Sequence, residues 1–380
     1  MRRAFYFQEL GLILVIILIG LLLAFFGGSV SIPSAAGRID VNKFLRPDNL
    51  VQLAKNTSFF AIMAVGAALV IISGGIDLSV GSIYALAAVC GAMALHRYGP
   101  LGAHPQAQGV TPVCAGLLAC LGVGALCGLV NGLLIVLLRV HPFIITLGTM
   151  AAFRGIAFIC PSWFAESGAV AIGQSIGDFP EAFTDHFIRM DLDRLIGRAG
   201  ESGLCPVPML IMIVVALAGW WTLAKTVFGR RLFALGSNET AARYCGVPVE
   251  RTKIIVYTLS GLTCGVAAAI MLGYYGAASS DTGTGYELSV IASAVVGGAS
   301  LSGGRGSAIG ALLGALILQI IDNAIIILRI NQNYSQIIIG AVIIIAVVLD
   351  KLNTLLIRRT ESGAPATQPH KEKQQTEEQQ

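Results

Sequence analysis

The chain has 380 residues, of which 55% are hydrophobic and only 12% are charged, and its mean hydropathy is +0.78. Soluble domains carry about a quarter of their residues as charged side chains, so these values exclude an ordinary water-soluble protein. With a formal net charge of only +4, we expect its main partner to be a lipid bilayer and not nucleic acid.

Apolar runs long enough to cross about 30 Å of hydrocarbon recur along the chain. They predict an all-α, polytopic membrane protein with about ten transmembrane helices. The eighth run is short and bounded by glycine, which is typical of a broken helix that lines a cavity. In chain order the runs are Leu10 to Phe26, Leu50 to Ile72, Val80 to Leu95, Val113 to Leu138, Phe143 to Cys160, Pro208 to Phe228, Ile254 to Tyr274, Glu287 to Gly298, Ser307 to Leu328 and Ser335 to Leu349.

The first run follows Arg2 and Arg3 and precedes Ser34-Ala35-Ala36, so a cleavable signal peptide is an alternative to a retained helix. We expect the retained helix, because the run is long enough to span and a multi-span protein needs no separate export signal.

Basic residues gather in the stretch 229–253 and after the last run, and Lys and Arg resist translocation. We therefore expect these regions and both termini on the cytoplasmic side of a membrane domain covering 1–350. The connection 161–207 has an acidic surplus and is expected outside, as a small hydrated cap. The tail 351–380 is rich in Gln, Glu and Lys and is expected to be disordered.

None of the eight cysteines forms a CxxC pair, so we expect no metal site. Most lie inside apolar runs, where a thiol behaves as a small hydrophobe. Cys160 and Cys205 bracket the outer connection, where thiols can oxidise, and they are the candidate disulfide.

An internal repeat relates the third to fifth runs to the eighth to tenth. Gly124-Ala125-Leu126 precedes Leu138-Arg139-Val140 by the same spacing that separates Gly314-Ala315-Leu316 from Leu328-Arg329-Ile330. Upstream, Asp77-Leu78-Ser79-Val80 matches Glu287-Leu288-Ser289-Val290. The odd offset predicts an inverted repeat, in which substrate binds near the midplane where broken helices meet. The expected breaks are Ser73 to Ser82 and Ala277 to Glu287.

Asp77 lies in the first break, and two interpretations of it stay open. It can cap the following helix, or it can line the route of a hydroxylated solute together with Ser79. Polar residues inside other runs either bind the solute or join helices: Asn131, Thr146, Gln319, Asp322 and Asn323. Glycines at four-residue spacing, Gly124, Gly128 and Gly132, and Gly306, Gly310 and Gly314, predict close helix packing.

The segment Gly236-Ser237-Asn238-Glu239-Thr240-Ala241-Ala242-Arg243 lies in the basic loop 229–253. Asn238 can cap a short helix from Glu239 to Cys245, which Gly246 would end. Such a helix between two spans is a rigid lever, whereas the simpler interpretation is a solvated loop that only sets topology.

This segment, followed by Gly246-Val247, resembles the coupling segment of ribose-type permeases in bacterial ABC importers. Further motifs fit that family in order over roughly 49–350: Gly75-Ile76-Asp77-Leu78-Ser79-Val80-Gly81-Ser82, Thr146-Leu147-Gly148-Thr149, Gly283-Thr284-Gly285-Tyr286-Glu287-Leu288 and Gly297-Gly298-Ala299-Ser300-Leu301-Ser302-Gly303-Gly304. The long connection between Cys160 and Cys205 and the polar tail depart from the family pattern.

The resemblance implies a non-enzymatic permease domain over 1–350 in the bacterial inner membrane, which carries a monosaccharide by alternating access. It implies an ATP-binding subunit, a periplasmic sugar-binding protein and a second permease copy as partners. The chain has no GxxxxGK[ST] loop, so it holds no cofactor itself, and ATP and Mg belong to the partner. The expected pathway residues are Asp77, Ser79, Asn131, Thr146, Glu287 and Asn323, and the expected coupling residues are Asn238, Glu239, Ala241, Ala242, Arg243, Gly246 and Val247.

Two rival functions remain. An ion-coupled secondary transporter would use the same inverted repeat, with Asp77, Glu287 or Asp322 as the titrating group. An intramembrane enzyme lacks a suitable base, because the histidines lie in connections, at run ends or in the tail and no HExxH or GxSxG motif occurs.

Overall fold

The computed structural model describes residues 2–34, 37–104, 109–164, 175–190, 205–345 and 348. Two strands, β1 (Ser29–Ser34) and β2 (Gly37–Asn42), form an antiparallel hairpin. The longer helices are α1 (Arg2–Phe26), α2 (Pro47–Ile72), α3 (Val80–His96), α4 (Val110–Leu138), α5 (Pro142–Phe164), α8 (Val207–Lys225), α11 (Val249–Tyr275) and α13 (Ala308–Ile327). The shorter ones are α6 (Glu181–Phe183), η1 (Thr184–Ile188), α9 (Val227–Ser237), α10 (Glu239–Tyr244), α12 (Tyr286–Val296) and an apolar helix at Tyr334–Ile345.

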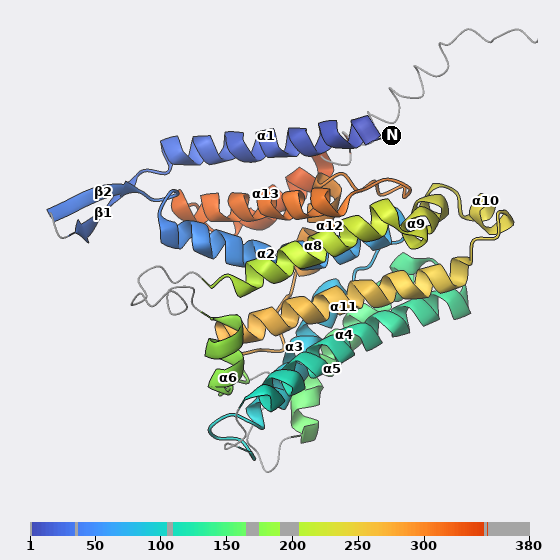
Figure 1. Cartoon of the computed structure of the whole chain (residues 1–380), viewed down its shortest axis with the longest axis horizontal. Coiled ribbons are helices and arrows are strands. Elements are labelled where there is room, and N and C mark those ends of the chain that lie inside the picture. Colours follow the sequence, from blue (N-terminus) through green and yellow to red (C-terminus); the bar gives the residue numbers. More distant parts are fainter. Residues whose placement is uncertain are drawn as a thin grey trace, which may run out of the picture.

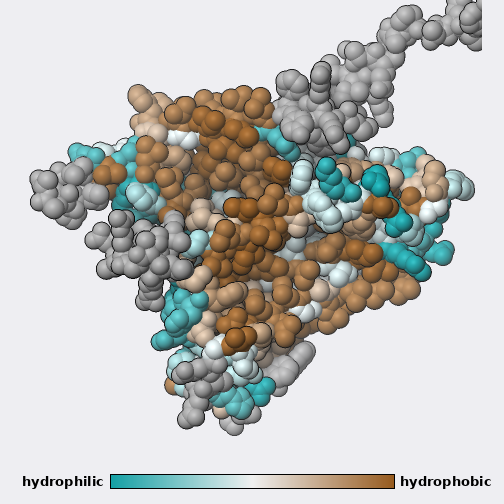
Figure 2. All heavy atoms as spheres, viewed as in Figure 1, coloured by the Kyte–Doolittle hydropathy of each residue, from teal (hydrophilic) through white to brown (hydrophobic). Residues whose placement is uncertain are grey.

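Seven of the described helices are long and apolar enough to cross a membrane, and three further apolar helices are shorter. Each predicted run coincides with one of these helices, so the polytopic, nearly all-α fold is confirmed. The number of complete spans stays a prediction. In Figure 2 hydrophobic residues cover the middle of the molecule, while hydrophilic residues gather at its two ends, as a bilayer-spanning protein requires.

The two ends of the molecule carry different segments. The N-terminus of α1 lies at the same end as α9 and α10, and the hairpin β1–β2, which was not predicted, lies at the opposite end (Figure 1). The described segment 175–190 of the 161–207 connection packs inward: Phe183 and Ile188 are buried, and Ile176 pairs with Ala278. The predicted tail 351–380 lies outside the described residues.

The helices α3 and α12 are half-length elements that run in opposite directions. After α2 the chain turns back at 73–79 before α3 begins, and after α11 it turns back at 276–285 before α12 begins. Each half-helix packs on the long helix that follows it, α3 on α4 and α12 on α13. The predicted breaks are therefore present, and the paired arrangement agrees with an inverted repeat.

Small residues bring α4 into backbone contact with α11, and α13 into backbone contact with α12. A Cβ on Gly124 would lie 2.4 Å from the carbonyl oxygen of Gly261 in α11, and one on Gly128 would lie 2.3 Å from that of Tyr257. In the second half, a Cβ on Gly314 would meet the carbonyl oxygen of Ser293 in α12. Close packing along these glycine faces was predicted and is confirmed.

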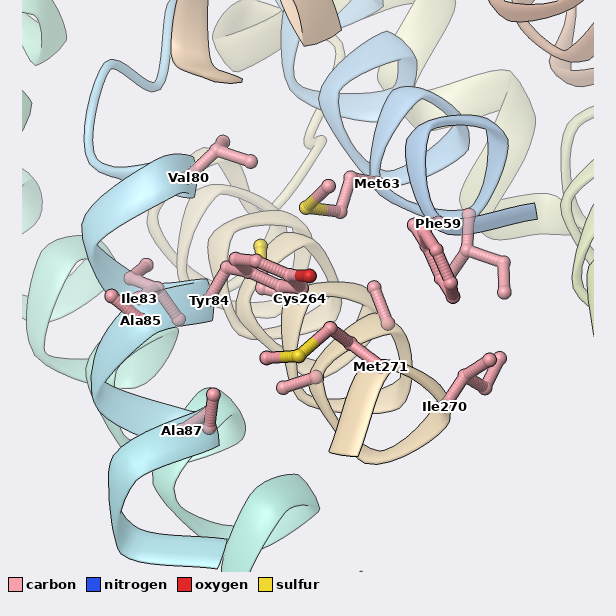
Figure 3. Packing of buried hydrophobic residues seen from close by; sticks show 14 of the residues in the cluster. Phe59, Met63, Val80, Ile83, Tyr84, Ala85, Ala87, Cys264, Ile270 and Met271 are labelled. Atoms are coloured by element: carbon pink, nitrogen blue, oxygen red, sulfur yellow. The ribbon is translucent and has the colours of Figure 1, made fainter. Parts of the chain in front are cut away.

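The largest buried cluster lies where α3 crosses α2 and α11. Figure 3 shows Tyr84 of α3 directed between Cys264 and Met271 of α11, with Met63 and Phe59 of α2 closing the other side. Tyr84 is 1% exposed. This cluster fixes the half-helix α3 inside the molecule and holds its first turn near the centre.

The predicted disulfide between Cys160 and Cys205 is not formed, so that prediction is wrong for this structure. Helix α5 continues through Cys160 to Phe164, which buries this thiol against α3: its Sγ lies 3.8 Å from the Sγ of Cys90 and 3.8 Å from the sulfur of Met93. The Sγ of Cys205 instead donates to the carbonyl oxygen of Arg189 at 3.4 Å.

Candidate functional site

Asp77 lies just before α3 and is 2% exposed. Its Oδ1 accepts hydrogen bonds from the backbone N–H of Ser79 at 3.0 Å and from the Ser79 hydroxyl at 2.6 Å, and its Oδ2 accepts one from Ser260 at 3.2 Å. The carboxylate therefore closes the turn that leads into α3 and ties this turn to α11. These contacts form a turn before the helix and not a helix cap, because the N-cap of α3 is Ser79 and no side chain caps the first amides of α3.

Two other predicted pathway residues join the same cluster. The side-chain amide of Asn131 in α4 donates to Ser79 Oγ at 2.7 Å, and the Thr146 hydroxyl in α5 donates to the carbonyl oxygen of Ile76 at 3.2 Å. Ser79, Asn131 and Thr146 are each 0% exposed. The cluster is thus a buried knot that joins α3, α4, α5 and α11.

The remaining two predicted residues lie apart from this knot. Glu287, in the first turn of α12, approaches the first turn of α3, because a Cβ on Gly81 would lie 2.5 Å from its Oε2. Asn323 of α13 exchanges hydrogen bonds with Asn49 of α2, at 2.7 and 3.1 Å, and so joins two helices. The lining of the cavity described next does not include these six residues, and their place in the pathway stays a prediction.

A cavity of about 650 Å³ opens instead between α2, α12, α13 and the segment that follows α13. Its wall combines aromatic rings with amide, hydroxyl and carboxyl groups, the mixture typical of small-molecule sites. It is lined by Asn56, Phe59, Phe60, Tyr275, Thr284, Gly285, Tyr286, Ser289, Gln319, Asp322, Ile325, Ile326, Gln332, Asn333, Ser335, Gln336 and Ile339.

Hydrogen bonds and ring contacts hold several of the lining groups in position. Tyr274 donates to Gln52 at 2.7 Å, and Gln52 in turn donates to Asn56 at 3.1 Å. The ring of Tyr286 packs 4.6 Å from that of Phe60, centre to centre. The Ser335 hydroxyl donates to Asp322 at 2.5 Å and closes the wall next to α13.

The cavity residues come from segments far apart in the chain, and little in the sequence separates them from polar residues with a structural role. Gln319 and Asp322 were recognised as polar groups inside a run, with solute binding and helix joining left open. Asn56 and Tyr286 were missed. Among the described residues that line the cavity, Asp322 is the only charged one, and no described cluster of His, Cys, Asp and Glu is able to hold a metal ion.

The segment 236–247 folds as predicted. The side chain of Asn238 accepts a hydrogen bond from the N–H of Ala241 at 2.9 Å and so caps α10. Gly246, with φ of +77°, ends the helix, and the N–H of Val247 donates to the carbonyl oxygen of Ala242 at 3.0 Å. Such a left-handed residue after a helix favours glycine.

Charged side chains fasten α10 to the start of α11. Lys253 donates to both carboxylate oxygens of Glu239 at 2.9 Å, and Arg243 donates to Glu250 and lies near Glu239. The hydrogen bond and charge of Glu250 raise the pKa of Arg243, so this guanidinium keeps its charge. Ala242 alone of the predicted coupling residues is buried, while Asn238, Glu239, Ala241, Arg243 and Gly246 are exposed.

Comparison with known proteins identifies relatives over most of the chain. A family model described as branched-chain amino acid transport system / permease component matches residues 49–347. The chain is 38% identical over 307 residues to the ribose import permease protein of Escherichia coli strain K12, an alignment covering 81% of this chain and 87% of that protein.

Two further relatives carry out transport of other solutes. The autoinducer 2 import system permease protein of Photorhabdus temperata is 37% identical over 287 residues, covering 76% of this chain and 78% of that protein. The D-allose transport system permease protein of Escherichia coli strain K12 is 33% identical over 316 residues, covering 83% and 87%. No solved structure matches. The chain therefore belongs to this family of transport system permease components.

Proposed function

We propose that this chain is the membrane-spanning subunit of an ATP-driven importer for a monosaccharide or a closely related polyhydroxylated solute. The observation that carries the substrate class is the cavity, whose wall pairs aromatic rings, among them Tyr286, with the amides of Asn56 and Gln319. Amides donate and accept hydrogen bonds to hydroxyl groups, and aromatic faces pack against the C–H faces of a sugar ring.

The family description names branched-chain amino acids, whereas the relatives quoted above import ribose, D-allose and autoinducer 2. A zwitterionic amino acid needs a cationic partner for its carboxylate, since an unpaired buried charge is costly. The described lining holds Asp322 and no Lys or Arg. A neutral hydroxylated solute suits this wall better than an amino acid does.

The partners follow from the cytoplasmic segment and from the family. An ATP-binding subunit, which would hold ATP and Mg, would dock on the exposed side of α10, where Tyr244 is 87% exposed and Arg243 is anchored by Glu250. A second permease copy would complete the membrane pathway, and a periplasmic sugar-binding protein would deliver the solute to the opposite end. In this arrangement both termini are cytoplasmic.

The mechanism is alternating access driven by the partner subunit. Closure of the ATP-binding subunits would displace α10, and the half-helices α3 and α12 would switch the cavity between the two sides. The permease performs no covalent chemistry. The buried knot around Asp77 would hold the first turn of α3 in place during this movement.

The test is reconstitution of the chain in proteoliposomes with the ATP-binding and solute-binding proteins encoded beside it. We expect uptake of labelled ribose or a related sugar that depends on ATP on the α10 side. Tyr286→Ala should raise the sugar concentration for half-maximal uptake at least tenfold, which corresponds to about 1.4 kcal/mol.

Tyr98→Ala is the matched control, because Tyr98 lies in the connection after α3 and contacts His104, away from the cavity. Its uptake should equal that of the unmodified chain. Uptake that ignores ATP and instead follows an imposed proton or sodium gradient would establish the secondary-transporter alternative. Uptake of leucine in preference to every sugar would overturn the substrate class.

A further inference from the structure

Three glycines from separate segments meet at the end of the molecule that carries α10. Gly236 is the penultimate residue of α9, Gly74 follows α2, and Gly303 lies in the loop between α12 and α13. A Cβ on Gly303 would lie 3.0 Å from the Cα of Gly236 and 3.0 Å from the Cα of Gly74. The three backbones are therefore in direct contact, and we name them the glycine junction.

The junction leaves no space for a side chain on Gly236. A Cβ there would lie 1.8 Å from the carbonyl oxygen of Ile72 and 2.5 Å from the backbone nitrogen of Gly304. Those two groups form a hydrogen bond of 2.9 Å with each other, from the Gly304 N–H to the Ile72 oxygen. Gly236 thus packs against the hydrogen bond that joins Ile72, at the end of α2, to Gly304 in the α12–α13 loop.

The backbone conformation of Gly74 and Gly303, the two partners of Gly236, also favours glycine. Gly74 has φ of +83° and Gly303 has φ of +79°, in the left-handed region that side chains disfavour. Gly236 itself has no such φ, so alanine would suit its backbone, and only the contact across the junction excludes it. This makes Gly236 the position at which the contact alone can be altered.

Each side of the junction leads to a functional element. Gly236 is two residues from Asn238, the cap of α10, while Gly74 is three residues from Asp77, which closes the turn into α3. Gly303 follows α12, an 11-residue helix roughly 16 Å long. At the other end of α12, Tyr286 and Ser289 line the cavity.

Helix α12 is also fastened to α13, so the two form one body. A Cβ on Gly297 would lie 2.2 Å from the carbonyl oxygen of Gly310, and one on Gly314 would lie 2.0 Å from that of Ser293. Helix α13 carries Gln319 and Asp322, which also line the cavity. In Figure 1, α12 and α13 lie together, with α8 and α9 running beside them toward α10.

We propose that the glycine junction transmits displacement of the cytoplasmic α9–α10 segment to the α12–α13 pair and hence to the cavity wall. Packed interfaces deform little, so a direct backbone contact passes on a displacement that flexible long side chains would absorb by changing conformation. This inference rests on the proposed ATP-driven function and names Gly236 as a positioning residue within it. Gly236 touches neither the solute cavity nor the exposed docking side of α10.

The test is Gly236→Ala in the reconstituted importer, with ATP hydrolysis and sugar uptake measured on the same proteoliposomes. We expect the ATP-binding subunit to co-purify and its ATPase rate to stay within about twofold, while sugar transported per ATP falls at least tenfold. The control is Gly122→Ala, a helical glycine of α4 whose Cβ would meet no atom within 4 Å. The amount of sugar that Gly122→Ala transports per ATP should match that of the unmodified chain.

A second measurement uses the unmodified complex, so it does not depend on the variant folding. Hydrogen exchange is followed in 72–79, 236–247 and 297–306 with and without a non-hydrolysable ATP analogue. We expect all three segments to change together. If only 236–247 responds, or if Gly236→Ala transports as much sugar per ATP as the unmodified chain, the glycine junction does not transmit the displacement and the proposal fails. Failure of the unmodified chain to bind an ATP-binding subunit overturns the proposed function instead.

Discussion

At the scale of single residues, Asp77 is a buried carboxylate that several donors surround. Its carboxylate accepts three hydrogen bonds, from the Ser79 backbone, the Ser79 hydroxyl and Ser260, while being 2% exposed. Removing an acceptor from such a site leaves buried donors without a partner. The residue is therefore expected to matter for stability before it matters for solute specificity.

Asp77→Ala should lower the free energy of unfolding by about 2–4 kcal/mol, because it strands the Ser79 and Ser260 donors. Asp77→Asn keeps one acceptor and should retain most of the stability and of the sugar transport. Unfolding of the purified chain in mixed micelles measures the first effect, and reconstituted uptake measures the second.

The matched control for Asp77→Ala is Asp48→Ala. Asp48 forms an exposed ion pair with Arg46 at the start of α2, so its loss should cost less than about 1 kcal/mol. If Asp77→Ala unfolds like the unmodified chain yet transports nothing, Asp77 acts in the pathway and its hydrogen bonds to Ser79 and Ser260 do not stabilise the fold.

The sequence predicted residues of local structure better than residues of the site. Asn238 as a cap and Gly246 as a helix end depend on their neighbours in sequence, and both predictions are confirmed. Whether a side chain lines a cavity depends on segments that are far away in the sequence. Asn323 and Asp322 are adjacent in one apolar run, yet Asn323 bonds Asn49 while Asp322 lines the cavity. No local signal separates these two roles.

At the scale of elements, the segment 276–285 is held by a basic residue that the sequence analysis did not single out. Arg154, half-buried in α5, donates to the carbonyl oxygens of Ser280 at 3.2 Å and Thr282 at 2.7 Å. The Ser280 hydroxyl returns a bond to the carbonyl oxygen of Ala157 at 2.9 Å. This break is therefore fastened to α5, and its end forms part of the cavity wall.

Arg154→Ala should loosen the 276–285 segment, because two charge-assisted hydrogen bonds are lost, each about 1.5–3 kcal/mol. We expect amide exchange in this segment to accelerate at least tenfold. Exchange in α10, at the far end of the molecule, should be unchanged and serves as the internal control. Equal exchange of 276–285 in both chains would mean that Arg154 does not hold the break.

At the scale of the whole molecule, the two halves share backbone features that the sequence match alone did not contain. Arg139 follows α4 and Arg329 follows α13 at equivalent places of the repeat, and both have φ of 55°. Helices α3 and α12 begin at equivalent breaks. The described cavity lies beside α12 and α13, and the Asp77 knot lies where α3 meets α4.

Matching the two halves predicted the architecture, while the place of Asp77 and Glu287 in the pathway stays a prediction. The acidic anchors Asp77 and Glu287 are equivalent in the repeat, and both were expected in the pathway. In the structure Asp77 is buried and closes the turn before α3, while Glu287 lies against the first turn of α3. Apolar periodicity specifies helices and their order, but which polar faces enclose space depends on side-chain packing between segments.

The orientation of the molecule is the remaining prediction at this scale, and two exposed positions at its opposite ends test it. Cys245 is an exposed thiol directly after α10. Leu101, which is 82% exposed, lies in the α3–α4 connection at the other end of the molecule, next to Asp178.

In a Cys114→Ser background, a membrane-impermeant maleimide added to intact cells should leave Cys245 unlabelled. In a Cys114→Ser, Cys245→Ser background, Leu101→Cys should be labelled, with the parent lacking Leu101→Cys as blank. Inverted vesicles should reverse both results, since basic segments such as 229–253 resist translocation. Labelling of Cys245 from outside intact cells would place α10 on the wrong side for an ATP-binding partner and exclude the proposed coupling.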